Sequence, residues 1–444
     1  MVPGYPAVMK AIGRARTLHR YDDLLGVPAR IVTAYHDGLP IAVLDAPTLF
    51  QRDGSPYGDA NGHDWGDNWL RFAALAKAAA DLASGIVGKG GYDILHAHDW
   101  QAGLAPAYLT YGEAPRRPAS VMTVHNMAFQ GMFGADIFPR LGLPHQAFSI
   151  EGVEYHSGVG YLKAGMALAD AITTVSPRYA EEIRTSEFGM GLEGLVRGRA
   201  DRVHGIVNGI DPAVWDPAHD PALAATYKPK TLPRRLANKR AVEAAFGLES
   251  DEGPLFIVVS RLTWQKGIDV LVEAIDHLVG LGGRLALLGS GDAAIEGALH
   301  AAAGRHPGRM AIRTGYDEPL SHLMQGGGDI ILVPSRFEPC GLTQLYGLAY
   351  GCVPLVARTG GLADTVIDAN AAALAADAAT GLQFAPVSYA GLSEAISRAI
   401  RLYHDETIWR RIQKRGMAAD FSWAASGRAY ADLYSNLSGK HASI

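Results

Sequence analysis

Short runs of apolar, often β-branched residues alternate with longer stretches of helical pattern along almost the whole chain. Most of these runs lack a period of two, which is expected of strands that are covered on both faces. The alternation predicts a doubly wound α/β protein. The predicted strands are residues 29–35, 92–96, 120–124, 171–175, 202–207, 255–259, 284–288, 310–314, 330–333 and 353–357, and the clearest helices are 69–86, 234–246, 270–279 and 389–403.

A cluster of turn residues divides these strands into two sets. Residues 208–212 read Asn-Gly-Ile-Asp-Pro, and a proline-rich stretch follows as far as Pro233. Such clusters are typical of linkers, and a chain of 444 residues is long enough for two domains of roughly 100–200 residues each. We therefore expect two Rossmann-like domains, 1–211 and 212–425, whose strands point their carboxyl ends at a shared cleft.

Charge and composition exclude several classes of partner. The net charge is −5, from 40 basic and 45 acidic residues, and no long basic block occurs. This argues against nucleic acid or an acidic membrane as the main partner. The two cysteines, Cys340 and Cys352, are too few for a disulfide framework,. The first residues do not resemble a signal peptide, and the longest apolar run is far shorter than the ~18–20 residues that span a bilayer. We expect a cytoplasmic protein.

Two histidine-containing clusters follow predicted strands of the first set. His96-Ala97-His98-Asp99-Trp100 comes after the strand at 92–95, and His125 follows the strand at 120–124. Two histidines at i and i+2 share one face of a strand and could bind a metal, but no further Cys or His cluster completes a four-ligand site. A substrate-binding or structural role is therefore favoured for the first cluster. A structural and a catalytic role remain equally open for His125.

Basic residues after a strand of the second set predict an anion site. Arg261 and Lys266 lie between the strand at 255–259 and the helix at 270–279. The free N–H groups and the dipole of a helix N-terminus add to such charges. The alternative is that both side chains are simply exposed, as in many strand–helix loops.

Residues 334–344 form a second candidate anion site before an apolar helix. Gly341 and Thr343 suit a close approach of phosphate,. Glu338 is out of place beside a phosphate unless it accepts hydrogen bonds from hydroxyl groups, which indicates a sugar. Cys340 is either an acidified thiol or a small packing residue, and packing is favoured.

Gly360 and Gly361 form a third glycine turn between a strand and a helix. Three such turns in one half of the chain suggest a nucleotide diphosphate held by backbone amides and two cations. No Walker A pattern and no complete G-x-G-x-x-G fingerprint occurs. Nucleotide hydrolysis and dinucleotide redox chemistry are therefore disfavoured.

Long strings of residues resemble the bacterial and plant glycogen/starch synthases. The strings are 96–100, 123–131, 187–194, 205–211, 260–267, 334–344 and 359–366, and the similarity runs from Val2 almost to the C-terminus. The resemblance implies two Rossmann-like domains of the GT-B fold, with a C-terminal helix at 426–444 crossing back onto the first domain. It also implies transfer of glucose from ADP-glucose to an α-1,4-glucan with retention of configuration and without a metal or cofactor.

The resemblance assigns roles by position. Arg261 and Lys266 neutralise the pyrophosphate of ADP, and Glu338 hydrogen-bonds the transferred glucose as a positioning group rather than a nucleophile. Tyr316 stacks on adenine. Leu342 and Thr343 contact phosphate, and the other residues beside the donor are Cys340, Gly341, Gly360 and Gly361. The sugar is contacted by Asp99, His125 and Asn208, with His125 near its 6-hydroxyl.

One departure from the family pattern concerns the start of the chain. Family members begin with a strand and a Lys-Thr-Gly-Gly-Leu-Ala-Asp loop, whereas residues 2–6 here resemble the segment that follows them. Roughly 30 or more residues, the opening of a βαβ unit, are therefore absent by comparison with the family. We favour an internal methionine taken as the start over a true short form. Loss of a central strand would open the sheet. Our hypothesis is that these 444 residues alone fold poorly or catalyse weakly.

Three alternative functions remain. A related transferase could use UDP-glucose or another acceptor, which donor competition would reveal. A truncated, non-catalytic glucan- or nucleotide-binding remnant is a second alternative, although the presence of Arg261, Lys266, Glu338 and His125 argues against it. A glycan phosphorylase would need a pyridoxal-phosphate lysine that the sequence does not identify.

Overall fold

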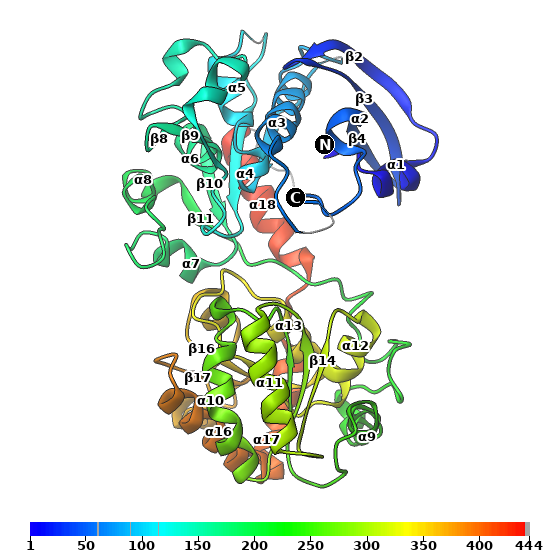
Figure 1. Cartoon of the computed structure of the whole chain (residues 1–444). Helices are drawn as coiled ribbons and strands as arrows, with labels where there is room; N and C mark the ends of the chain where they lie inside the picture. The colour runs from blue at the N-terminus through cyan, green and yellow to red at the C-terminus, as the bar shows by residue number, and fades with distance from the viewer. Residues whose placement is uncertain (60–61, 89, 114, 440–444) are drawn as a thin grey trace. The chain divides into compact units, whose positions relative to one another are not determined.

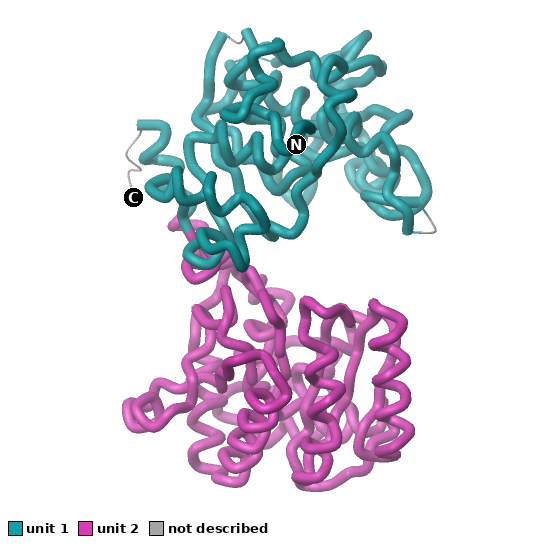
Figure 2. Tube along the Cα trace, turned by 60° about the vertical axis from the view of Figure 1, so that its left-hand side comes forward, with its two compact units in different colours: residues 1–174, 180–204, 430–444 teal, residues 175–179, 205–429 magenta. Residues whose placement is uncertain are grey.

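The chain forms two compact units in a computed structural model that describes residues 1–59, 62–88, 90–113 and 115–439. Unit 1 contains residues 1–174, 180–204 and 430–444, and unit 2 contains 175–179 and 205–429 (Figure 2). The predicted domain bounds, 1–211, 212–425 and 426–444, remain a prediction. The last helix, α18 (Trp423–Ser438), begins in unit 2 and continues in unit 1.

Unit 2 is a three-layer α/β/α domain around a six-stranded parallel sheet of order β14-β13-β12-β15-β16-β17. In this order β12 is central, and the chain moves outward first to one edge and then to the other, as in dinucleotide-binding folds. The strands are β12 (Leu255–Val259), β13 (Arg284–Gly289), β14 (Met310–Thr314), β15 (Ile330–Val333), β16 (Val353–Ala357) and β17 (Leu382–Phe384).

Helices cover both faces of this sheet because its strands are apolar on both sides (Figure 1). Phe256 and Val258 pack with α10, α11, α16 and α17, whereas Leu255 and Ile257 pack with α9 and α12. The helices are α9 (Arg235–Phe246), α10 (Ile268–Gly280), α11 (Ala293–Arg305), α12 (Glu318–Gly327), α13 (Thr343–Tyr350), α14 (Gly360–Thr365), α15 (Ala371–Ala375), α16 (Tyr389–Tyr403) and α17 (Glu406–Ala418).

Unit 1 contains two four-stranded sheets, β1-β4-β3-β2 and β11-β10-β6-β5, and a small sheet β7-β9-β8. Its main helices are α3 (Asn68–Ser84), α5 (Ala105–Tyr111) and α6 (Tyr161–Leu168), with the shorter α1 (Pro6–Ile12), α2 (Pro47–Phe50), α4 (Asp99–Ala102) and α8 (Glu193–Gly198). Helix α7 (Pro177–Glu182) is divided between the two units. Its strands are β1 (Val2–Pro3), β2 (Arg16–Leu24), β3 (Val27–His36), β4 (Leu39–Asp45), β5 (Ile94–His98), β6 (Ala119–Val124), β7 (Met132–Phe133), β8 (Glu154–Tyr155), β9 (Gly158–Gly160), β10 (Ala171–Thr174) and β11 (Val203–Gly205).

The first sheet differs from the parallel arrangement that a doubly wound pattern implies. Strands β2, β3 and β4 are antiparallel. Two-residue turns join them, Leu25-Gly26 and Asp37-Gly38, and all four turn residues have positive φ. Positive φ at both positions defines the turn that matches the twist of a β-hairpin, so these turns force the chain straight back on itself.

Strand β5 lies at an edge of the second sheet. A cavity of about 470 Å³ lies near its amino end, and a larger one of about 860 Å³ lies between β3, β4, α3 and β5.

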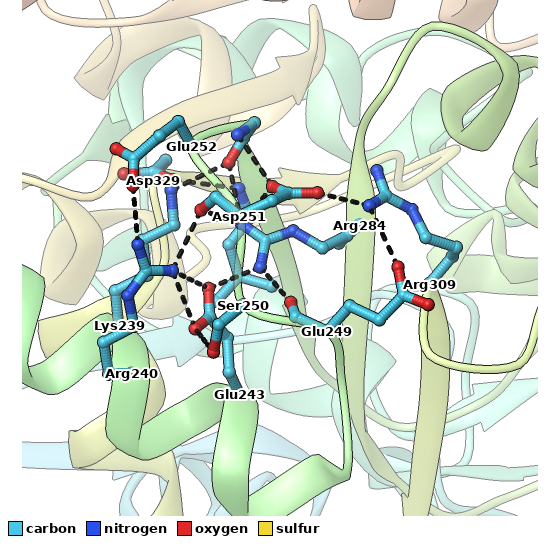
Figure 3. Close-up of polar contacts among 12 residues, drawn as sticks. Lys239, Arg240, Glu243, Glu249, Ser250, Asp251, Glu252, Arg284, Arg309 and Asp329 are labelled. Atoms are coloured by element: carbon cyan, nitrogen blue, oxygen red, sulfur yellow. Dashed lines mark hydrogen bonds and ion pairs between the residues drawn. The ribbon is translucent and has the colours of Figure 1, made fainter.

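A buried ionic network joins the amino ends of the strands in unit 2 (Figure 3). The side chains of Arg284 and Glu243 have no exposed surface and form an ion pair. Arg284 also pairs with Asp251 at 3.0 Å, and Arg240 donates to Glu243 at 2.9 Å. Burial raises the pKa of Glu243, but hydrogen bonds from Arg240, Ser250 and Arg284 outweigh that effect and lower it. The carboxylate is therefore held in its charged form.

We predict that Arg284→Met lowers the free energy of unfolding by about 3–5 kcal/mol, because it removes the fully buried partner of the Glu243 carboxylate,. Urea unfolding followed by circular dichroism measures the loss. The exposed pair Arg305–Asp276, at 3.1 Å, provides the control, and Arg305→Met should cost less than about 1 kcal/mol. Adding Glu243→Leu to Arg284→Met should recover part of the stability. Equal losses in the two single variants would contradict the prediction.

Candidate active site

A cavity of about 180 Å³ opens in unit 2 where β12 and β15 lie side by side. The chain leaves these two strands toward opposite edges of the sheet, so their following loops separate and leave a crevice. The cavity contains six of the predicted site residues: Arg261, Lys266, Glu338, Gly341, Leu342 and Thr343. The other lining residues are Val259, Ser260, Ile268, Leu332, Val333, Pro334 and Ser335.

Lys266 and Glu338 form an ion pair in this cavity. Nζ of Lys266 lies 2.5 Å from Oε2 of Glu338, and Oγ of Ser335 donates to the same oxygen at 3.0 Å. Glu338 is only 7% exposed. Both bonds end on Oε2, and no bond to Oε1 is found among the described residues. Oε1 can therefore accept a hydrogen bond from a ligand hydroxyl, while Lys266 retains donors for an anion.

The loops after β12 and β15 are tied together on either side of this pair. Arg336 binds Asp269 with two bonds of 2.6 and 2.7 Å and donates to the backbone oxygen of Trp264 at 2.7 Å. Its guanidinium also lies 4.4 Å from the Trp264 ring. Gly267 has φ of 65°, and a Cβ at this position would lie 1.9 Å from the Pro334 oxygen. Only glycine permits this close approach of the two loops.

The glycine turn at 360–361 packs against the backbone that carries Glu338. The Gly361 N–H donates to the oxygens of Glu338 and Pro339, both at 3.1 Å. A Cβ on Gly360 would lie 2.0 Å from the Glu338 oxygen. Both glycines are buried and do not line the cavity. The Gly361 amide is thus engaged by the chain itself, and the turn supports the loop beneath the cavity.

Cys340 lies below the cavity surface as a buried free thiol. Burial raises its pKa to about 12, although a hydrogen bond from the Asn208 backbone lowers it slightly. A thiol with a raised pKa is not an acidified nucleophile, which favours packing, the preferred interpretation from sequence. Asn208 belongs to unit 2 in this structure. Tyr316, which follows β14, is 82% exposed and does not line the cavity.

Asp99 and His125 lie in unit 1, at the carboxyl ends of β5 and β6. Oδ1 of Asp99 accepts the backbone N–H of His125 at 2.7 Å. Asp99 has φ of 53°, a left-handed conformation that is uncommon outside glycine,. Burial raises the pKa of Asp99, with the N–H groups of His125 and Asn126 opposing that shift. Asp99 thereby fixes the backbone from which the His125 side chain projects.

Sequence reasoning missed three residues that shape these sites. Ser335 binds Glu338, and Arg336 joins the two loops, yet both look like ordinary polar loop residues in the sequence. His98 belongs to the cluster for which a substrate-binding or structural role is favoured, but its contact with His125 is not predicted: its Nδ1 lies 3.0 Å from Nε2 of His125. Its position two residues after His96 on a strand was the available signal.

The described ranges contain neither a metal-binding cluster nor a membrane-spanning helix. No group of three or more His, Cys, Asp or Glu side chains is arranged there to hold a metal ion. No described helix is both long and apolar enough to cross a membrane.

Known proteins resemble the chain over nearly its full length. The family described as starch synthase catalytic domain matches residues 1–198, and glycosyl transferases group 1 matches 240–415. Glycogen synthase of Novosphingobium aromaticivorans is 66% identical, covering 98% of this chain and 90% of the relative. Glycogen synthase 1 of Rhizobium meliloti is 56% identical, covering 99% and 92%.

A solved structure shares the fold. The catalytic domain of starch synthase IV from Arabidopsis thaliana, bound to ADP and acarbose, superposes with a TM-score of 0.86 at 31% identity. The similarity covers 99% of this chain and 92% of that one. The fold and the cavity at the β12–β15 crevice therefore define a glycosyltransferase of the GT-B class. With the identities above, the chain belongs to the glycogen synthase family, and its reaction is glucosyl transfer in glycogen synthesis.

We predict that Gly267→Ala lowers the unfolding free energy by at least about 2 kcal/mol, because the new Cβ meets backbone and the residue must keep a positive φ. Thermal unfolding measures the change. Gly297→Ala, in α11 with nothing within 4 Å of its Cβ, is the control and should be neutral or stabilise by up to about 1 kcal/mol. A stable Gly267→Ala variant would show that the loops can separate.

We also predict that Cys340 and Cys352 react slowly with a disulfide reagent at pH 8 in the native protein. Burial raises both pKa values to about 12, so both thiols stay protonated, and the thiolate is the reactive form. The reaction is followed by the thionitrobenzoate that an aromatic disulfide reagent releases when a thiol attacks it, and this release should become fast only in denaturant. Rapid reaction of one thiol before unfolding would contradict this prediction.

Proposed function

We propose that the chain transfers glucose from ADP-glucose to the non-reducing end of an α-1,4-glucan, with retention of configuration and release of ADP. The observation that carries the proposal is the pairing of Lys266 with Glu338 in a cavity that also exposes Arg261 and the start of α13. Such a site offers cations and backbone N–H groups to phosphate and a carboxylate to sugar hydroxyls. The likeness to a starch synthase domain solved with ADP and acarbose supports the choice of donor and acceptor.

In the proposed reaction the bond between the anomeric carbon and the β-phosphate oxygen breaks, and its electron pair stays on ADP. The acceptor 4-hydroxyl oxygen bonds to the anomeric carbon on the same face, and its proton passes to a phosphate oxygen. Negative charge on ADP grows in the transition state. Arg261 and Lys266 therefore stabilise the transition state more than bound substrate.

Glu338 accepts hydrogen bonds from the transferred glucose and holds it against the cations. Leu342, Thr343 and Gly341 place the first turn of α13 beside the phosphates, where the helix has unpaired N–H groups. The assignments of Tyr316 to adenine, and of His125, Asp99 and Asn208 to the sugar, rest on the family resemblance. The proposed reaction includes no metal, so activity should persist in EDTA.

The test is incorporation of labelled glucose into glycogen from ADP-glucose, with UDP-glucose as the competing donor. We expect Lys266→Ala to lower kcat by about 10²–10³-fold, as removal of one transition-state donor does elsewhere, with a smaller change in KM. The exposed Lys230 gives the control, and Lys230→Ala should match the unaltered chain. Preference for UDP-glucose would overturn the choice of donor. Donor binding without incorporation would instead support the non-catalytic remnant.

A further inference from the structure

Three histidine rings form a stack at the carboxyl ends of β5 and β6 in unit 1. His96 and His98 point to the same face of β5, and their ring centroids lie 4.2 Å apart at an interplanar angle of 27°. The ring of His125 lies 5.3 Å from that of His98 at 26°. The middle ring, His98, is therefore held between the other two.

Hydrogen bonds extend this stack in both directions. Nδ1 of His98 lies 3.0 Å from Nε2 of His125. At the other end, Nδ1 of His96 lies 2.6 Å from the Tyr434 hydroxyl, and Nε2 lies 2.5 Å from Oγ1 of Thr123. Both nitrogens of His96 are thus bonded, which prevents its ring from turning. Tyr434 belongs to α18, so the last helix of the chain anchors the stack.

The rings of His96 and His98 are neutral near pH 7. Loss of hydration lowers the pKa of His96 to about 3 and that of His98 to about 4. His98 and His125 also lower the pKa of His96, and His125 and the amino group of Met1 also lower the pKa of His98. The carboxylate of Asp99 accepts a hydrogen bond from the backbone N–H of His125. A neutral imidazole has one donor and one acceptor nitrogen, so the role of His98 Nδ1 dictates whether Nε2 of His125 accepts or donates.

We propose that His98 is a positioning residue for glucosyl transfer, which fixes the orientation and hydrogen-bonding role of the His125 ring. Tyr434 acts on the His125 ring through His96 and His98. The proposal rests on the proposed contact of His125 with the sugar. Of the three rings, only His125 acts on substrate. His98 and His96 act through it, as outer residues orient metal-bound histidines elsewhere.

His98→Leu and His98→Asn form a matched pair for the test. Asparagine keeps a polar atom near the position of Nδ1, whereas leucine fills the space without one. We expect His98→Leu to lower kcat about tenfold, the scale of outer-residue effects, and to change KM for ADP-glucose by less than about threefold. His98→Asn should recover most of kcat. Equal loss in both variants, or loss through KM alone, would overturn the proposal.

A second measurement separates this proposal from the role of His125 in the reaction. Nitrogen-15 spectra of histidine-labelled protein report which ring nitrogen of His125 carries the proton. We expect that pattern to change in His98→Leu and, to a smaller extent, in Tyr434→Phe, and to persist in His98→Asn. Tyr430→Phe is the control, because it keeps the ring that packs 5.5 Å from His96. An unchanged pattern in His98→Leu overturns the coupling of the two rings. A changed pattern with full activity shows instead that His125 does not act on the sugar, and overturns the positioning role.

Discussion

The reversal of strand order between β12 and β15 is the constraint on which the site in unit 2 depends. The connections that follow these two neighbouring strands run toward opposite edges of the sheet. Their loops therefore separate and leave a crevice between them. The loop after β12 brings Arg261 and Lys266, and the loop after β15 brings Glu338. The topology of the sheet therefore determines where the site lies, and the side chains of the two loops supply its chemistry. The ties through Arg336 and Gly267 then hold the two loops at the required distance.

The strands of unit 2 could be predicted from the sequence because they are continuous apolar runs. The bounds of β12, β14, β15 and β16 agree with the predicted ranges 255–259, 310–314, 330–333 and 353–357. Strand β2 was not predicted, because Arg16–Leu24 carries charged residues at exposed positions and contains no continuous apolar run. The Asp37-Gly38 hairpin turn was a usable signal for the antiparallel meander that was not recognised.

The candidate site was predictable only in part. Strand–loop–helix patterns located the cations, the carboxylate and the glycines, because these residue types follow strands in a recognisable way. The patterns did not show which backbone N–H groups would form hydrogen bonds within the protein and so be unable to bind a ligand. Gly361 resembles a phosphate-binding residue, yet its amide serves the backbone of Glu338 and Pro339. Ser335 and Arg336 depend on loop geometry, which no short sequence pattern encodes.

The ionic network around Arg284 lies at the amino ends of the strands, whereas the cavity lies at their carboxyl ends. Much of what holds the sheet of unit 2 together is thus remote from the residues that contact substrate. Side chains of the crevice loops that face the cavity can therefore change without disturbing this network, whereas Gly267 and Arg336, which hold the two loops together, are constrained. The scaffold is suited to acquiring new donors or acceptors by drift at one end of the sheet, while the other end supplies robustness to mutation.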